Sequence, residues 1–167
     1  MRSLVMCGSR KFKDYFDVFA LFFRKRNVVV NYPNFHYQRK KTVYIPELMF
    51  VRSPAQRLRV SGLVHTHIQK IRETAGEGGV CLIVNPLPKC GQKLPFGYIG
   101  DNTILEIGVA ITLGMRVLML RPFDEVSIMS VVPADDKSRF FVLVHPKLDP
   151  CDPDVVWPWL RRFLNGS

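Results

Sequence analysis

The chain has 167 residues, of which 47% are hydrophobic and 23% are charged, and its formal net charge is +10. This length suits one domain with its own core, and the hydrophobic fraction excludes an intrinsically disordered chain. No apolar run reaches the roughly 18 residues that a membrane span needs. The N-terminal apolar stretch is also too short for a signal peptide. We therefore expect a single cytoplasmic domain over residues 1–167, without a membrane partner.

The charge is unevenly distributed along the chain. Residues 1–60 carry the entire net charge of +10, whereas residues 61–167 are balanced. A positive half favours an anionic partner, either a phosphorylated small molecule or nucleic acid, although a solvated basic surface has the same composition.

The four cysteines show no CxxC spacing, so neither a zinc site nor a redox motif is indicated. We expect reduced thiols and no metal or cofactor, with Cys7 and Cys81 in the core.

The first third of the chain predicts two strands that flank a helix. Residues 3–7 form an apolar run that ends at Gly8, which is typical of a buried strand. Asp14 to Arg26 has phenylalanines near helical spacing and basic residues in its last turn, so it predicts an amphipathic helix. Residues 27–32 predict a second strand. A basic excursion follows at about residues 33–59, and residues 42–45 within it have strand composition.

The remainder alternates between helix and strand. A helix is predicted from Pro54 to about Ala75, with an apolar stripe of Leu58, Val64, Ile68 and Ile71. A long loop at residues 85–100 precedes an apolar helix at Asn102–Leu113, for which Gly114 is a suitable C-terminal cap. Three further strands and a terminal helix are expected at residues 80–84, 117–120, 140–144 and 154–163.

Short apolar strands that alternate with helices predict an α/β fold, a Rossmann-like or flavodoxin-like parallel sheet with helices on both faces. Ligands in such sheets bind beyond the carboxyl ends of the strands. This rule selects the turn at Gly8–Phe12, the loop at Asn85–Asn102 and the helix start that follows.

The turn after the first strand offers groups that suit a phosphate. Gly8 permits close approach to a ligand, Ser9 offers a hydroxyl and Arg10 a guanidinium, and a helix begins soon afterwards. The segment is neither a complete GxGxxG motif nor a P-loop, and an ordinary turn with a surface arginine has the same composition.

A glycine-rich segment at residues 96–108 carries one carboxylate, Glu106, among apolar residues. Such a carboxylate has either a structural partner or a chemical role. The structural alternative is a capping box in which Thr103 caps the helix and Glu106 reaches back to a backbone N–H. His65 and His67 lie about 200° apart on a helix and cannot easily share a metal. One of them could serve the site as a proton donor.

With these residues the chain resembles the nucleoside 2-deoxyribosyltransferase-like family, particularly its poorly characterised prokaryotic branch. The resemblance covers about residues 3–32 and 60–122. It rests on Cys-Gly-Ser after the first strand, on His67–Ile71 before a buried strand, and on the segments Gly97–Thr103 and Leu105–Gly108.

The resemblance implies cleavage of N-glycosidic bonds, with Glu106 in the position of the nucleophile that attacks the anomeric carbon. It implies that Ser9 and Arg10 hold a 5′-phosphate. The other substrate-binding positions that we infer at the strand ends are Gly8, Asn85, Gly97, Tyr98, Gly100, Asn102 and Thr103. The chain departs from the family at His67, where the family has an aspartate.

Three functions are compatible with the sequence: a nucleoside or nucleotide N-glycosidase or deoxyribosyltransferase, a non-catalytic nucleotide-sensing module, and a nucleic-acid-associated protein. A homodimer or larger assembly is also expected, because the helix at residues 102–113 is apolar on nearly every side and must be covered on more than one. The alternative cover is the C-terminal tail of the same chain, with Trp157, Trp159, Leu160 and Phe163.

Overall fold

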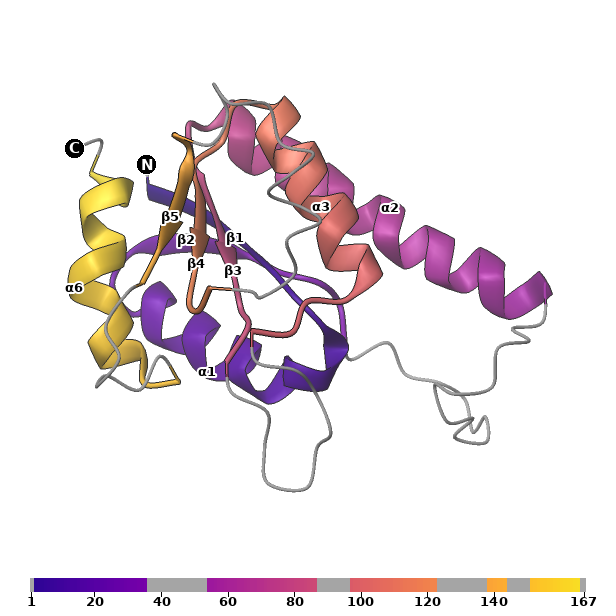
Figure 1. Ribbon diagram of the computed structural model, residues 1–167, viewed down its shortest axis with the longest axis horizontal. Coiled ribbons are helices and arrows are strands. Elements are labelled where there is room, and N and C mark those ends of the chain that lie inside the picture. The colour runs from indigo at the N-terminus through magenta and orange to yellow at the C-terminus, as the bar shows by residue number, and fades with distance from the viewer. Residues whose placement is uncertain (1, 36–53, 87–96, 123–137, 144–150, 166–167) are drawn as a thin grey trace.

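A computed structural model describes residues 2–35, 54–86, 97–122, 138–143 and 151–165 (Figure 1). The predicted strand at residues 42–45 lies outside these ranges. None of the described helices is long and apolar enough to cross a membrane. The elements are β1 (Arg2–Cys7), a 3₁₀ turn (Arg10–Phe12), α1 (Lys13–Arg24), β2 (Val28–Asn31), α2 (Pro54–Gly76), β3 (Val80–Ile83), α3 (Asp101–Thr112), β4 (Val117–Met119), β5 (Phe140–Val142) and α6 (Pro153–Leu164).

The strands form one five-stranded sheet in the order β2-β1-β3-β4-β5, and every pairing in it is parallel. Leu4 of β1 lies beside Val30 of β2 and Val80 of β3, and Val117 of β4 lies beside Phe140 of β5. This is the strand order of flavodoxin-like folds, in which the chain reverses its direction of winding between β1 and β3. The predicted α/β fold is confirmed.

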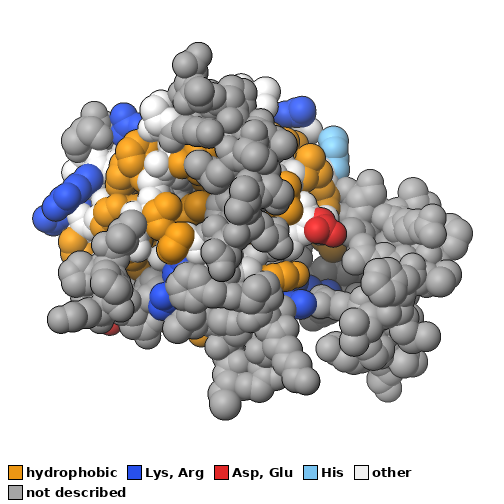
Figure 2. Space-filling view, viewed as in Figure 1, with side chains coloured by type: hydrophobic (Ala, Val, Ile, Leu, Met, Phe, Trp, Pro, Cys, Tyr) orange, Lys and Arg blue, Asp and Glu red, His pale blue; other side chains and the backbone are white. Residues whose placement is uncertain are grey.

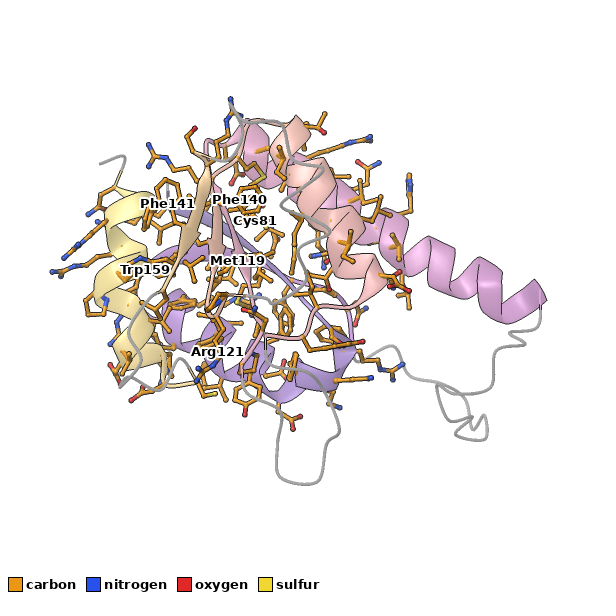
Figure 3. The ribbon with its side chains drawn as sticks, viewed as in Figure 1. Cys81, Met119, Arg121, Phe140, Phe141 and Trp159 are labelled. Carbon is orange, nitrogen blue, oxygen red and sulfur yellow. The ribbon has the colours of Figure 1, made fainter. Side chains whose placement is uncertain are left out.

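Helices cover both faces of the sheet, with α1 and α6 on one face and α2 and α3 on the other (Figure 1). The side chains of successive strand residues therefore pack against helices on opposite faces of the sheet. Leu4 and Met6 belong to the cluster under α1 and α6, whereas Val5 and Cys7 belong to the cluster under α2 and α3. Phe141 likewise packs on the α6 side and its neighbour Phe140 on the opposite side (Figure 3).

The face under α1 and α6 has an aromatic core. Phe19 and Phe23 stack with ring centroids 5.7 Å apart, and Trp157 of α6 lies 6.1 Å from Phe23. Phe163 of α6 lies 4.6 Å from Phe141 of β5. The alternative in which Trp157, Trp159, Leu160 and Phe163 cover the apolar helix α3 is therefore wrong, because these residues pack against the opposite face of the sheet.

The helix α2 is continuous through Gly62, but its buried stripe differs from the predicted one. His67, Ile71 and Thr74 are buried, whereas Val64 and Ile68 are only half-buried. The side chain of Leu58 is outside the part of the chain that the structure describes. The buried stripe differs from the predicted one because two polar residues, His67 and Thr74, occupy core-facing positions. A search for apolar spacing alone does not identify such positions.

The end of α3 confirms the predicted role of Gly114. Its φ of +75° places it in the left-handed region that favours glycine, and its N–H donates to Ile111 O at 2.8 Å. The N–H of Met115 donates to Ala110 O at 3.0 Å, which completes a Schellman cap.

Candidate functional site

The carboxyl end of β1 brings together segments that are far apart in the sequence. Gly8 follows β1 directly, and a Cβ atom at this position would lie 2.6 Å from Val84 O and 3.0 Å from Phe16 Cζ. Only glycine fits between β3 and α1 here. Beyond it, the rings of Phe12 and Tyr98 lie 6.4 Å apart, and Lys11 Nζ lies 4.9 Å from the Tyr98 ring centroid. The first turn and the glycine-rich segment are therefore neighbours, as the carboxyl-end rule predicted.

Asn85 connects the ends of β3 and β4 to the glycine-rich segment. Its Nδ2 donates to Gly97 O at 3.3 Å and to Arg121 O at 2.9 Å, and its Oδ1 accepts from Arg121 N at 3.1 Å. Arg121 comes just after β4, at the carboxyl edge of the sheet (Figure 3). The buried amide thus positions the backbone of this edge.

The other expected substrate-binding residues surround the same edge. Ser9 caps the 3₁₀ turn by accepting from Lys11 N at 3.3 Å, and Arg10 is exposed. Gly97 turns the chain with a φ of +66°, Gly100 is the N-cap of α3, and Asn102 is exposed in its first turn. Thr103 is buried, and its backbone N–H donates to Gly100 O at 2.8 Å. Figure 2 shows basic side chains at several points around this view of the molecule and few acidic ones among the described residues.

Glu106 lies in the interior of α3, with only 4% of its surface exposed. The N-cap of this helix is Gly100, which makes Thr103 the third helical residue rather than the cap. The capping-box alternative is therefore wrong. Glu106 instead interacts with the backbone of Gly8 and the side chain of Cys7, both at the end of β1.

Glu106 meets His67 and Cys7 in a buried cluster contributed by α3, α2 and β1. His67 Nε2 lies 3.7 Å from Glu106 Oε1 and 3.4 Å from Cys7 Sγ. His67 is 2% exposed and Cys7 is completely buried. His65, two residues earlier on α2, is exposed, so the two histidines do occupy different environments.

Burial shifts the pKa values of this cluster toward the neutral forms. It raises the pKa of Glu106 to about 8, against smaller opposing effects from Cys7 and the Gly8 backbone. Burial, together with the charge of Lys70, lowers the pKa of His67 to about 3. Burial and the neighbouring Cys81 raise the pKa of the Cys7 thiol well above its usual value. At neutral pH the cluster therefore consists of a carboxylic acid, a neutral imidazole and a thiol, and a thiolate nucleophile is not favoured.

Sequence reasoning assigned Cys7 only to the core and did not include it in the site. The available signal was its position, because the last residue of a buried parallel strand lies at the edge where ligands bind.

Glu106 does not line either of the following two cavities. One of about 250 Å³ lies at the carboxyl end of β2, next to Arg24, Tyr32 and Lys70. The other, of about 400 Å³, lies at the opposite edge of the sheet, next to Gly79, Gly114 and Phe163.

Comparison with protein-family models, curated proteins and solved structures gave no match.

Proposed function

We propose that the protein is a nucleoside or nucleoside 5′-monophosphate N-glycosidase, or a related deoxyribosyltransferase, with Glu106 as its nucleophile. The observation that carries the proposal is the position of Glu106. This carboxyl group is buried at the end of β1, where the winding of the sheet reverses between β1 and β3 and where flavodoxin-like folds bind their ligands. Burying a carboxyl group without a full set of partners costs free energy, so its position there favours a chemical role.

The proposed reaction runs through the ionised form of Glu106. Glu106 must lose its proton to attack, and because its pKa is about 8 whereas the pKa of His67, 3.7 Å from Glu106 Oε1, is about 3, the proton passes to solvent rather than to the imidazole. In the first step a bond forms from a carboxylate oxygen to the anomeric carbon, and the bond from that carbon to the base nitrogen breaks. The departing base takes up a proton from solvent. Water or a second base then displaces Glu106 from the anomeric carbon.

The turn after β1 supports recognition of a phosphate. Ser9 and the exposed Arg10 lie in this turn, next to the Gly8 backbone that interacts with Glu106. A guanidinium and a hydroxyl at this place suit the 5′-phosphate of a nucleotide whose sugar lies against Glu106.

A second function, a nucleotide-sensing module without catalysis, is favoured by a separate observation. Glu106 is a protonated acid at neutral pH and is almost completely buried. A group in this state binds a ligand by hydrogen bonding more readily than it attacks carbon.

The experiment that separates the two is a chromatographic screen of nucleosides and nucleoside monophosphates for released base. The enzyme releases free base, and Glu106→Ala should lower the rate by about a thousandfold or more while the circular dichroism spectrum stays unchanged. Glu73→Ala, at an exposed glutamate on α2, serves as the matched control and should retain activity. Near-normal turnover in Glu106→Ala would refute the nucleophile, and saturable binding without turnover would identify the sensor.

A further inference from the structure

We propose that Cys7, His67 and Glu106 form a binding site for a thiophilic divalent metal ion, with Zn²⁺ as the best fit. The sulfur, nitrogen and oxygen atoms that these residues offer all lie within 4.8 Å of one another, and all three residues are buried. They come from β1, α2 and α3, so the fold itself brings them together.

Two of the three donor separations agree with the edges of a tetrahedron around zinc. With usual zinc–ligand bond lengths, a sulfur and a nitrogen ligand are about 3.5 Å apart, and a nitrogen and an oxygen ligand about 3.3 Å apart. The corresponding separations here are 3.4 Å for Cys7 Sγ to His67 Nε2 and 3.7 Å for His67 Nε2 to Glu106 Oε1. The third separation, from Cys7 Sγ to a Glu106 carboxyl oxygen, is no more than 4.8 Å, and side-chain adjustment must bring it to the edge of about 3.6 Å that the same tetrahedron requires.

The chemistry of the donors points to the same class of ion. Thiolate and imidazole ligands select Zn²⁺ over the hard cations Mg²⁺ and Ca²⁺, which prefer oxygen. The second carboxyl oxygen, Glu106 Oε2, is buried and has no hydrogen-bond partner among the described residues. Binding replaces the proton on the Cys7 thiol and the proton on the Glu106 carboxyl by one metal ion, and both protons pass to solvent.

Three protein ligands leave the fourth position of a tetrahedral ion open. An ion held by Cys7, His67 and Glu106 uses the Glu106 carboxylate as a ligand. The carboxylate is then unavailable for attack on a sugar. The site therefore acts as an inhibitory metal site of the proposed enzyme. The metal-binding inference stands apart from the proposed function, since the metal can be titrated without any nucleotide.

Titration of the metal-free protein with Co²⁺ alone tests the inference. Wild-type protein should develop visible absorption bands and a near-ultraviolet band from thiolate-to-cobalt charge transfer, saturating at one ion per chain, and Zn²⁺ should abolish both. Cys7→Ala should lose the near-ultraviolet band, whereas Cys81→Ala should retain it. Cys81 is the matched control because it is equally buried and its sulfur lies 3.6 Å from that of Cys7.

The two histidines of α2 provide a second matched pair. His67→Gln should weaken Co²⁺ binding by about tenfold or more, whereas His65→Gln should leave it unchanged. Absence of the charge-transfer band in wild-type protein, or its persistence in Cys7→Ala, would overturn the proposal.

If Cys7→Ala fails to fold, X-ray absorption of the zinc-loaded wild type decides the question. One sulfur ligand with nitrogen and oxygen neighbours is expected, and a shell with no sulfur or with two would overturn the proposal. Base release is measured separately in the presence of a chelator, so failure of the enzyme proposal leaves the metal result intact.

Discussion

The two faces of the sheet are built from different kinds of side chain. Under α1 and α6 the core is aromatic, with four fully buried phenylalanines from the 3₁₀ turn and α1, namely Phe12, Phe16, Phe19 and Phe23. Under α2 and α3 the core is mainly aliphatic and includes the thiols Cys7 and Cys81. The buried polar residues on described helices all come from this second pair, and they are His67, Thr74, Thr103 and Glu106.

The two faces therefore differ in what they contribute: the aromatic face contributes stability, and the α2–α3 face carries the chemically reactive groups. Aromatic side chains bury much apolar area and stabilise the fold, whereas burying a carboxyl and an imidazole opposes folding unless each finds full partners. Glu106 Oε2 and His67 Nδ1 have no hydrogen-bond partner among the described residues. We infer that the aromatic face provides the stability that lets the α2–α3 face hold groups poised for reaction.

The largest expected effect on stability is at the aromatic face. Phe19→Ala removes a completely buried ring that stacks on Phe23, and should lower the free energy of unfolding by about 3–5 kcal/mol. Urea denaturation measures this change. Activity per folded molecule should stay at the wild-type level. A loss below about 1 kcal/mol, or a specific loss of activity, would contradict the division between the faces.

The α2–α3 face should make stability depend on pH through Glu106. Because the pKa of Glu106 is raised from 4.5 to about 8 in the folded state, its protonated form stabilises the fold. This contribution is complete below pH 4.5 and is lost as pH rises through about 8. The glutamine of Glu106→Gln does not titrate in this pH range. The free energy of unfolding of the variant, relative to that of the wild type, should therefore increase by up to a few kcal/mol between about pH 5 and pH 8.

Denaturation of both proteins across this pH range measures the effect. The pKa of His67, lowered to about 3, destabilises the fold as pH falls below 6.5. Because the wild type and the variant share this histidine, its contribution cancels to a first approximation in their difference. A difference that does not change with pH would show that Glu106 is ionised in the folded protein.

Recognition of phosphate at the carboxyl edge should depend on Arg10. A hydrogen bond from a charged group contributes about 1.5–3 kcal/mol, so Arg10→Ala should weaken binding of a nucleoside monophosphate by about 10- to 150-fold. Binding of the unphosphorylated nucleoside should barely change. Isothermal titration calorimetry compares the two ligands, with Lys13→Ala as a control at an exposed basic residue of α1. Equal losses for both ligands would show that Arg10 does not contact a phosphate.

The smallest expected effect concerns self-association through the outer surface of α3, which a dimer would reveal as a twofold increase in mass. Leu105 is 50% exposed on this helix, and α6 packs on the opposite face of the sheet. We propose a second copy of the chain as the cover, so sedimentation equilibrium at micromolar concentration should give a dimer or larger species. Leu105→Asp should yield monomer, whereas Leu21→Asp on α1 should not. A wild-type species at the chain mass of 19.2 kDa would refute the assembly.

The sequence predicted the strands and helices well because their patterns are local. The apolar runs at β1, β3 and β4 and the glycine after α3 need no knowledge of distant residues. The face covered by α6 was not predictable, since its aromatic residues fit either side of the sheet. The contact between Cys7 and His67 was not predicted because the two residues are 60 positions apart in the sequence. In addition, a search for regularly spaced apolar residues does not identify a buried histidine.

Mass spectrometry of the quenched enzyme tests most directly whether Glu106 is the group on the α2–α3 face that reacts with the sugar. Protein mixed with a nucleotide substrate that the chromatographic screen identifies should gain the mass of one sugar phosphate, in the peptide that contains Glu106. Glu106→Gln should gain none. Base release without any labelled protein, or a label on a different residue, would contradict the account.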